Sequence, residues 1–317
     1  MIRRTLPLLT CLAVLALSSP AVQAQGDFDK VEIQTTDLSH GLFMLKGAGG
    51  NIGLCVGPDG AFLIDDQYAP LTEKIVAAVA AVTDEPVGFV FNTHYHGDHT
   101  GGNESLGEMG SHLVSHTNVR RRLSVDQTSA LLGSTAAAAA PGALPNITFT
   151  DSLTFHHNGQ EIIAFHVPHA HTDGDGVLHF PQANVIHAGD VVFYGLYPYI
   201  DTAAGGSIDG MIAGVERIIG LCDDNTQVIP GHGPLVNKGQ LTEYLNMLTR
   251  ARANVAAEMG KGSDLAAVQA AQPCAEWDQS HGQTWLTSDQ FVQSIFDSLT
   301  NAHDNHANHA EHSGHDH

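Results

Sequence analysis

Four good metal ligands lie within six residues of this chain, in the stretch FNTHYHGDHTGGN. They are His94, His96, Asp98 and His99. Imidazole nitrogens and carboxylate oxygens are ligands that zinc takes in small tetrahedral sets. At the end of a strand, residues two apart point to the same side, so His94 and His96 can hold one ion together. The chain then turns, so Asp98 and His99 are aimed differently and suit a second ion nearby.

Three further ligands follow strand-like runs later in the chain. They are His171 in PHAHTDGDG, Asp190 in HAGDVVF and His232 in IPGHGP. Loops at the ends of sheet strands can converge on one site in α/β folds. Two metal ions roughly 3.5–4 Å apart can share a bridging hydroxide, which is a nucleophile near neutral pH. The pattern therefore indicates a dinuclear zinc site with hydrolytic chemistry.

The ligands lie in four short elements with a fixed order. These elements are HYHGDH (94–99), HTDGD (171–175), GD (189–190) and PGHG (230–233). In them the chain resembles the metallo-β-lactamase-fold hydrolases, over roughly residues 30–300.

The resemblance implies an αβ/βα sandwich and two zinc ions per chain. The ligand sets that it implies are His94, His96 and His171 for one ion, Asp98, His99 and His232 for the other, and Asp190 as the bridge. It also implies a catalytic role for Asp98, which would orient the attacking hydroxide. Asp65 would support the site from behind the ligands.

Strand-like runs separated by helical segments occur twice along the chain. This pattern predicts an α/β fold of four layers, with two sheets face to face and helices outside. Strands are expected on both sides of the turns at 39–41, 58–60 and 158–159, and at VGFVFN (87–92). Helices are expected at 70–82, 119–133, 208–221, 241–259 and 291–299. The low-complexity stretch STAAAAAPGALPN (134–146) is expected to be a flexible surface segment.

Residues 1–24 are expected to be a signal peptide that is removed. Two arginines precede an apolar run at 6–17 that is too short to span a bilayer, and VQA at 22–24 fits a cleavage site. An uncleaved anchor is the alternative. We therefore expect an exported protein, periplasmic or secreted, whose main domain occupies 25–300 and does not span the membrane.

The charge and the C-terminal end narrow the choice of partners. A formal net charge of −21 disfavours nucleic acid and anionic membrane surfaces, so a small-molecule substrate is expected. Residues 301–317 carry a histidine at nearly every third position among polar residues, and we expect a disordered His-rich tail. Such tracts bind zinc, copper or nickel. The alternative function is therefore a periplasmic zinc-binding or redox-pathway accessory protein in which this tail carries the function.

Three cysteines remain after removal of the signal peptide. Cys55 lies in the apolar run IGLCVG and is expected to be a buried thiol in a strand. An exported protein permits disulfides, so Cys222 and Cys274 are the expected pair.

The reaction class is clearer than the substrate. A β-lactam, a lactone, an ester and a thioester all present a carbonyl carbon to the nucleophile. The zinc β-lactamases that the chain resembles carry Cys, or Ser with altered ligands, at the position of Asp190. An aspartate at this position is more similar to the glyoxalase II and lactonase branches of the family. Export favours a β-lactamase-like role instead. Tyr194 and Tyr197 could line the substrate pocket, with ordinary packing as the alternative.

Overall fold

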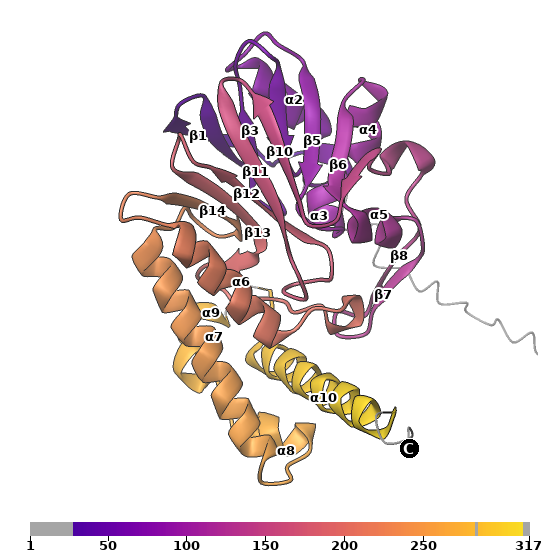
Figure 1. The fold of residues 1–317 in the computed structure, drawn as a ribbon, viewed down its shortest axis with the longest axis vertical. Helices are drawn as coiled ribbons and strands as arrows, with labels where there is room; N and C mark the ends of the chain where they lie inside the picture. Colours follow the sequence, from indigo (N-terminus) through magenta and orange to yellow (C-terminus); the bar gives the residue numbers. More distant parts are fainter. Residues whose placement is uncertain (1–27, 283–284, 313–317) are drawn as a thin grey trace, which may run out of the picture. The chain divides into compact units, whose positions relative to one another are not determined.

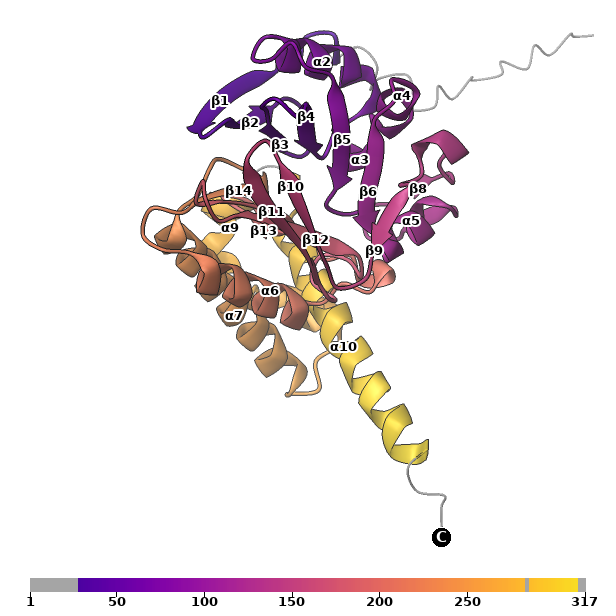
Figure 2. The same ribbon diagram turned by 45° about the horizontal axis from the view of Figure 1, so that its top comes forward.

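The computed structural model describes residues 28–282 and 285–312, with side chains through residue 302. The chain divides into two units, Met1–Val31 and Glu32–His317, and the second unit contains the sheets. In that unit, a seven-stranded and a five-stranded sheet lie face to face (Figures 1 and 2). The expected signal peptide lies outside the described residues.

The seven-stranded sheet has the order β1-β2-β3-β4-β5-β6-β9. Its strands are β1 (Gln34–Ser39), β2 (Leu42–Lys46), β3 (Ile52–Cys55), β4 (Ala61–Ile64), β5 (Val87–Asn92), β6 (His112–His116) and β9 (Ile147–Phe149). Neighbours from β1 to β4 pair antiparallel, and those from β4 to β9 pair parallel. The parallel pairs bring the ends of β4, β5 and β6 to one edge of the sheet.

The five-stranded sheet has the order β10-β11-β12-β13-β14. Its strands are β10 (Ser152–His157), β11 (Gln160–Val167), β12 (Asp175–Phe180), β13 (Val185–Phe193) and β14 (Gln227–His232). The first four strands pair antiparallel, and β13 pairs with β14 in parallel. A separate hairpin consists of β7 (Gln127–Ser129) and β8 (Ser134–Ala136).

Apolar side chains fill the space between the sheets. Phe62 and Phe91 from the first sheet belong to one buried cluster with Leu178 and Phe180 from the second. The strand β4, AFLI, is a continuous apolar run because both faces of the sheet are covered at this position.

Helices cover the outer faces. The helices are α2 (Thr72–Ala80), α3 (Gly97–Thr100), α4 (Asn103–Glu108), α5 (Thr117–Leu123), α6 (Ile208–Leu221), α7 (Lys238–Met259), α8 (Leu265–Ala270), α9 (Asp278–His281) and α10 (Ser288–His312). A second buried cluster joins the outer face of the five-stranded sheet to α6, α7 and α10. Ile75 and Val79 are the buried side of α2. The predicted four-layer αβ/βα sandwich is confirmed.

Two sequence predictions differ from the structure between residues 119 and 146. The helix predicted at 119–133 ends at Leu123, the last residue of α5, and the β7–β8 hairpin begins at Gln127. The stretch 134–146, expected to be a flexible surface segment, supplies β8 and a short 3-10 helix, Pro141–Ala143. Asp126 closes the base of this hairpin by accepting a hydrogen bond from Ala138 N at 2.9 Å.

The C-terminal helix differs in length. The segment 291–299 lies inside α10, whose backbone continues into the His-rich segment. Side chains from residue 303 on, and residues 313–317, lie outside the described part, so the disordered His-rich tail at 301–317 stays a prediction. Among the described residues, no helix is both long and apolar enough to cross a membrane.

The expected disulfide is absent from the described part of the chain. Cys222 and Cys274 are separate buried thiols, and so is Cys55. The thiol of Cys222 donates instead to the carbonyl of Ile218, one turn earlier in its own helix. Burial raises the pKa of Cys274 to about 12, so that thiol stays protonated.

Candidate metal centre

The ends of four strands bring the seven candidate ligands together. The first four ligands follow β5, and the others lie in the loop before β12, in β13 and at the end of β14. The turn after β5 is fixed by its own hydrogen bonds. Asn92 Nδ2 donates to the carbonyl of His99 at 3.3 Å, and Thr100 Oγ1 donates to that of His96 at 3.1 Å. The ligands form two groups, and each group could hold a metal ion. The first group is His94, His96, His171 and Asp190, and the second group is Asp98, His99 and His232.

In the first group, three ring nitrogens face one another. His96 Nδ1 lies 3.1 Å from His94 Nε2 and 2.9 Å from His171 Nε2. Asp190 Oδ2 lies 3.6 Å from His94 Nε2 and 3.4 Å from His171 Nε2. All but His96 are buried.

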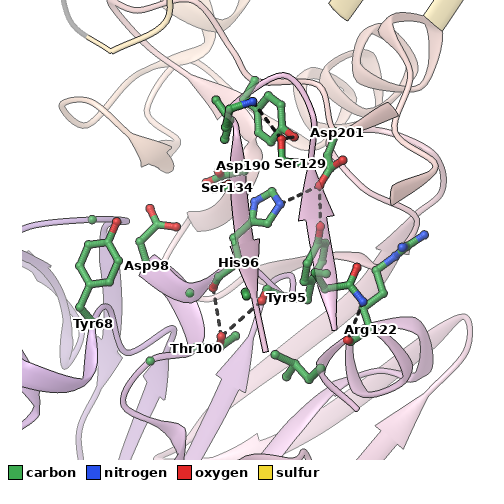
Figure 3. Close-up of a pocket in the computed structure, with 18 of the residues that line it drawn as sticks. Tyr68, Tyr95, His96, Asp98, Thr100, Arg122, Ser129, Ser134, Asp190 and Asp201 are labelled. Atoms are coloured by element: carbon green, nitrogen blue, oxygen red, sulfur yellow. Dashed lines mark hydrogen bonds and ion pairs between the residues drawn. The ribbon is translucent and has the colours of Figure 1, made fainter. Parts of the chain in front are cut away.

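The opposite nitrogens of His171 and His96 show where their protons are. His171 Nδ1 donates to the carbonyl oxygen of Tyr199 at 2.7 Å. His96 Nε2 donates to Asp201 Oδ2 at 2.9 Å, and the hydroxyl of Tyr95 donates to the same oxygen at 2.6 Å (Figure 3). A neutral imidazole carries one proton, so His171 Nε2 and His96 Nδ1 have lone pairs.

The same reasoning applies to His94. Thr93 Oγ1 donates to Asp65 Oδ2 at 2.8 Å, so this hydroxyl accepts from His94 Nδ1 at 3.1 Å. His94 Nε2 is therefore also without a proton. Burial holds the pKa of His94 well below its usual range, so its ring is neutral.

The second group has a similar arrangement. His99 Nδ1 donates to Asp65 Oδ2 at 2.7 Å, which leaves His99 Nε2 facing His232 Nε2 at 3.4 Å. Asp98 Oδ2 lies 3.5 Å from His99 Nε2 and 3.3 Å from His232 Nε2. Asp65 thus supports His99 directly and His94 through Thr93. Its backbone has a positive φ of 64°.

Asp190 lies between the two groups. Its Oδ2 is 3.4 Å from His232 Nε2, and its Oδ1 is 3.2 Å from His99 Nε2. Oδ1 is buried and accepts no hydrogen bond from the described residues. The backbone of Gly231 packs directly on this carboxylate, where a Cβ atom would collide with Oδ1.

These observations test whether the residues fit metal ions, and they do. In the first group, lone pairs of ring nitrogens face one another without a proton between them, and Oδ1 of the buried Asp190 has no donor among the described residues. A cation between them relieves both conditions. The local field points the same way, because Asp190 and Asp98 raise the pKa of His232 to about 9 although burial opposes this. Nitrogen and carboxylate donors of this kind suit zinc and its neighbours in the first transition row.

A cavity of about 820 Å³ opens over the second group. Asp98, Asp190, His96 and His232 form part of its floor. Figure 3 shows Tyr68 on the side of Asp98, with Tyr95 and Arg122 across the cavity from it. The candidate metal centre is therefore accessible to a small molecule.

The structure brings together all seven ligands that the sequence singles out. Tyr194 is different, because it is not among the residues that line the cavity and its hydroxyl donates to Glu243 at 3.1 Å. Tyr197 is buried, and its hydroxyl donates to Asp278 at 2.7 Å. Neither tyrosine lines this cavity, so ordinary packing, the alternative for both, describes them, and the substrate-binding role predicted for Tyr194 is not supported by its position. The residues that do so and were missed are Tyr68, Tyr95, Tyr199, Asp201 and Trp285.

Comparisons with known proteins agree with this geometry. A family model described as the metallo-beta-lactamase superfamily matches residues 45–238. The metallo-beta-lactamase type 2 of Bacillus cereus is 24% identical over 190 residues, which are 60% of this chain and 69% of that protein.

Two solved structures show the same fold. A metallo-beta-lactamase from Pontibacter korlensis has a TM-score of 0.57 and 19% identity, covering 69% of this chain and 99% of its own. A double mutant of the sec-alkyl sulfatase PisA1 has a TM-score of 0.63 and 16% identity, covering 83% of this chain and 50% of its own.

Proposed function

Because the chain belongs to the metallo-β-lactamase superfamily, we propose that it is an exported metal-dependent hydrolase that acts on a carbonyl compound. The observation that carries the proposal is the pair of ligand groups joined by Asp190 at the floor of an open cavity. Two zinc ions are the cofactors that we propose, one for each group.

The ligand groups would hold the ions, and the chain supplies the rest. When bound, two such ions supply Lewis acidity toward the carbonyl oxygen and make water a nucleophile near neutral pH. Asp98 is suited to orient that water because its side chain is 21% exposed and is ionised. Burial would raise its pKa, but the nearby His99 and His232 lower the pKa to about 2. An ionised carboxylate at this place accepts a hydrogen bond from the attacking water.

The net reaction is hydrolysis. The oxygen of water bonds to the acyl carbon, and the bond from that carbon to oxygen, sulfur or nitrogen breaks. The leaving group takes one proton of the water. A β-lactam, a lactone, an ester and a thioester all fit this balance.

Rates with substrates of each kind test the proposal. The zinc-loaded chain without residues 1–24 is assayed with a chromogenic cephalosporin, para-nitrophenyl acetate and a thioester, and His94→Ala is the blank. We expect hydrolysis of at least one substrate that the blank lacks. A clear rate with the cephalosporin makes the protein a working β-lactamase despite Asp190. No rate with any of them, with zinc shown to be bound, would refute the proposal.

Export is the second part of the proposal, and the basic and apolar N-terminal residues support it. Expression of the full chain in a bacterium, followed by fractionation and mass determination, tests it. We expect a chain shortened by about 24 residues outside the inner membrane. Full-length chain in the cytoplasm would contradict this part alone.

A further inference from the structure

Exposed apolar side chains gather at the cavity over the metal centre. Of the seven large apolar side chains that are exposed among the described residues, four line this cavity. They are Tyr68, Val125, Leu132 and Trp285. Such a concentration of exposed apolar surface marks a binding site for an apolar group.

The alanine-rich stretch forms much of one wall. Its lining residues are Ala136, Ala137, Ala139, Ala140 and Ala143. Small aliphatic side chains leave the cavity wide and offer no polar group to orient a ligand. Together with Val125 and Leu132 of the hairpin, they form what we call the aliphatic wall.

The aliphatic wall is connected to the metal centre through Tyr199. The Tyr199 hydroxyl and Ser129 Oγ of the hairpin lie 2.8 Å apart in a hydrogen bond. The Trp285 ring lies 6.1 Å from that of Tyr199 and 6.3 Å from the His232 ring. Aromatic rings therefore lead from the candidate ligand His232 to Tyr199, whose hydroxyl holds the hairpin through Ser129. Leu132 lies toward the tip of the hairpin, where its backbone N–H donates to Ser129 Oγ at 3.2 Å.

The charged residue on this side is already paired. Arg122 donates to Asp173 from Nε at 2.7 Å and from Nη2 at 2.8 Å, so its charge is neutralised within the protein. Lys46 and Glu104 also line the cavity and carry charges of opposite sign. The residues of the aliphatic wall itself carry no charge, so a ligand group along this wall is uncharged.

We propose that the aliphatic wall binds the alkyl chain of the acyl group, so that the preferred substrates are esters or thioesters of medium- or long-chain aliphatic acids. This inference rests on the proposed function, because it assigns the substrate class of the same site. A carbonyl group at the ligand groups places the chain along Trp285 and Tyr199 toward Leu132. Each methylene that the wall buries contributes to binding, which raises kcat/KM about threefold per methylene.

A matched pair of leucines tests the wall. Leu132 is 38% exposed and lines the cavity, whereas Leu221 is 40% exposed at the end of α6 and does not line it. The ratio of kcat/KM for para-nitrophenyl octanoate to that for the acetate is measured in the zinc-loaded wild type, Leu132→Asn and Leu221→Asn. We expect a wild-type ratio well above ten, a ratio at least about fivefold smaller in Leu132→Asn, and the wild-type ratio in Leu221→Asn.

A binding measurement separates this inference from the proposed function. Methyl octyl ketone and methyl propyl ketone carry a carbonyl and an alkyl chain but no leaving group. Their binding is followed by the fluorescence of Trp285 in a Trp277→Phe background, because the chain contains two tryptophans. We expect the longer ketone to bind at least about tenfold more tightly, and Leu132→Asn to reduce this preference.

The outcomes distinguish the two claims. Chain-length-dependent ketone binding without hydrolysis of any ester supports the wall and refutes the hydrolase. Hydrolysis with an octanoate-to-acetate ratio near one, or with equal ratios in the two leucine variants, overturns the wall and leaves the hydrolase intact. A wild-type preference for the phenylacetyl ester over the octanoyl ester also overturns it, because the occupant would then be aromatic.

Discussion

Asp201 should control how tightly the first ligand group binds zinc, although it is not itself a ligand. Its Oδ2 accepts from His96 Nε2 at 2.9 Å and fixes the ring so that Nδ1 faces the other two histidines. The carboxylate is buried, and the hydrogen bond from His96 helps hold its pKa below the usual range against that burial. Hydrogen bonds to a charged acceptor contribute about 1.5–3 kcal/mol, and about half of this remains when the acceptor is neutral.

Asp201→Asn keeps the shape and removes the charge. It should therefore cost about 1.4 kcal/mol of zinc binding, or tenfold in affinity, whereas Asp201→Ala should cost up to about a hundredfold. Tyr95→Phe leaves the bond from His96 to Asp201 in place and should have the smaller effect.

Competition for zinc with a fluorescent chelator measures this affinity. A His232→Ala background weakens the second ligand group, so that the titration reports the first. Asp209→Asn is the matched control, since it removes one exposed acid that pairs with Arg252. If the zinc affinity of Asp201→Asn is within twofold of that of its parent, or if Asp209→Asn loses as much zinc affinity as Asp201→Asn, then Asp201 does not control zinc binding through His96.

Three further outcomes are expected. Removing metal with a chelator should lower the melting temperature by several degrees, because an ion whose free concentration is a hundred times its Kd stabilises the fold by about 2.7 kcal/mol. Calorimetry with and without chelator checks this, and equal melting temperatures would mean that no ion binds. Burial, with a contribution from His166, lowers the pKa of His116 to about 4, so that from about pH 6.5 downward the unfolded chain takes up a proton that the folded chain does not. At pH 5 the metal-free wild type should therefore have lost about 2 kcal/mol more stability than His116→Asn, measured by urea unfolding at pH 7.5 and pH 5, and parallel losses would contradict the assignment. Deleting residues 301–317 should leave hydrolysis unchanged in zinc-replete buffer, and a loss of most activity would favour the accessory function in which the tail does the work.

The fold was predictable where local pattern and packing agree. The strand VGFVFN and the helix Ile208–Leu221 have the predicted bounds. An apolar run favours a buried strand, and apolar residues at helical spacing favour a helix with one buried face, so each pattern indicates a single structure. The pattern failed between residues 119 and 146. The helix predicted at 119–133 ends at Leu123, and part of the stretch predicted to be flexible, 134–146, pairs with β7 as a hairpin along the cavity. Contacts outside the segment therefore decide its structure.

The site shows the same division. The seven ligands are recognisable because each lies in a short element whose order carries information. Asp201 carries no such signal: it is a single acid 105 residues away from His96, and only the fold places the two side chains together. Trp285 also lies beyond residues 45–238, the part that the family model matches. The candidate metal ligands thus come from the part of the chain that the family model matches, while Trp285, which lines the cavity, lies outside that part. Substitutions in the cavity wall should therefore change which ester is hydrolysed, whereas substitutions among the ligands should decide whether any is.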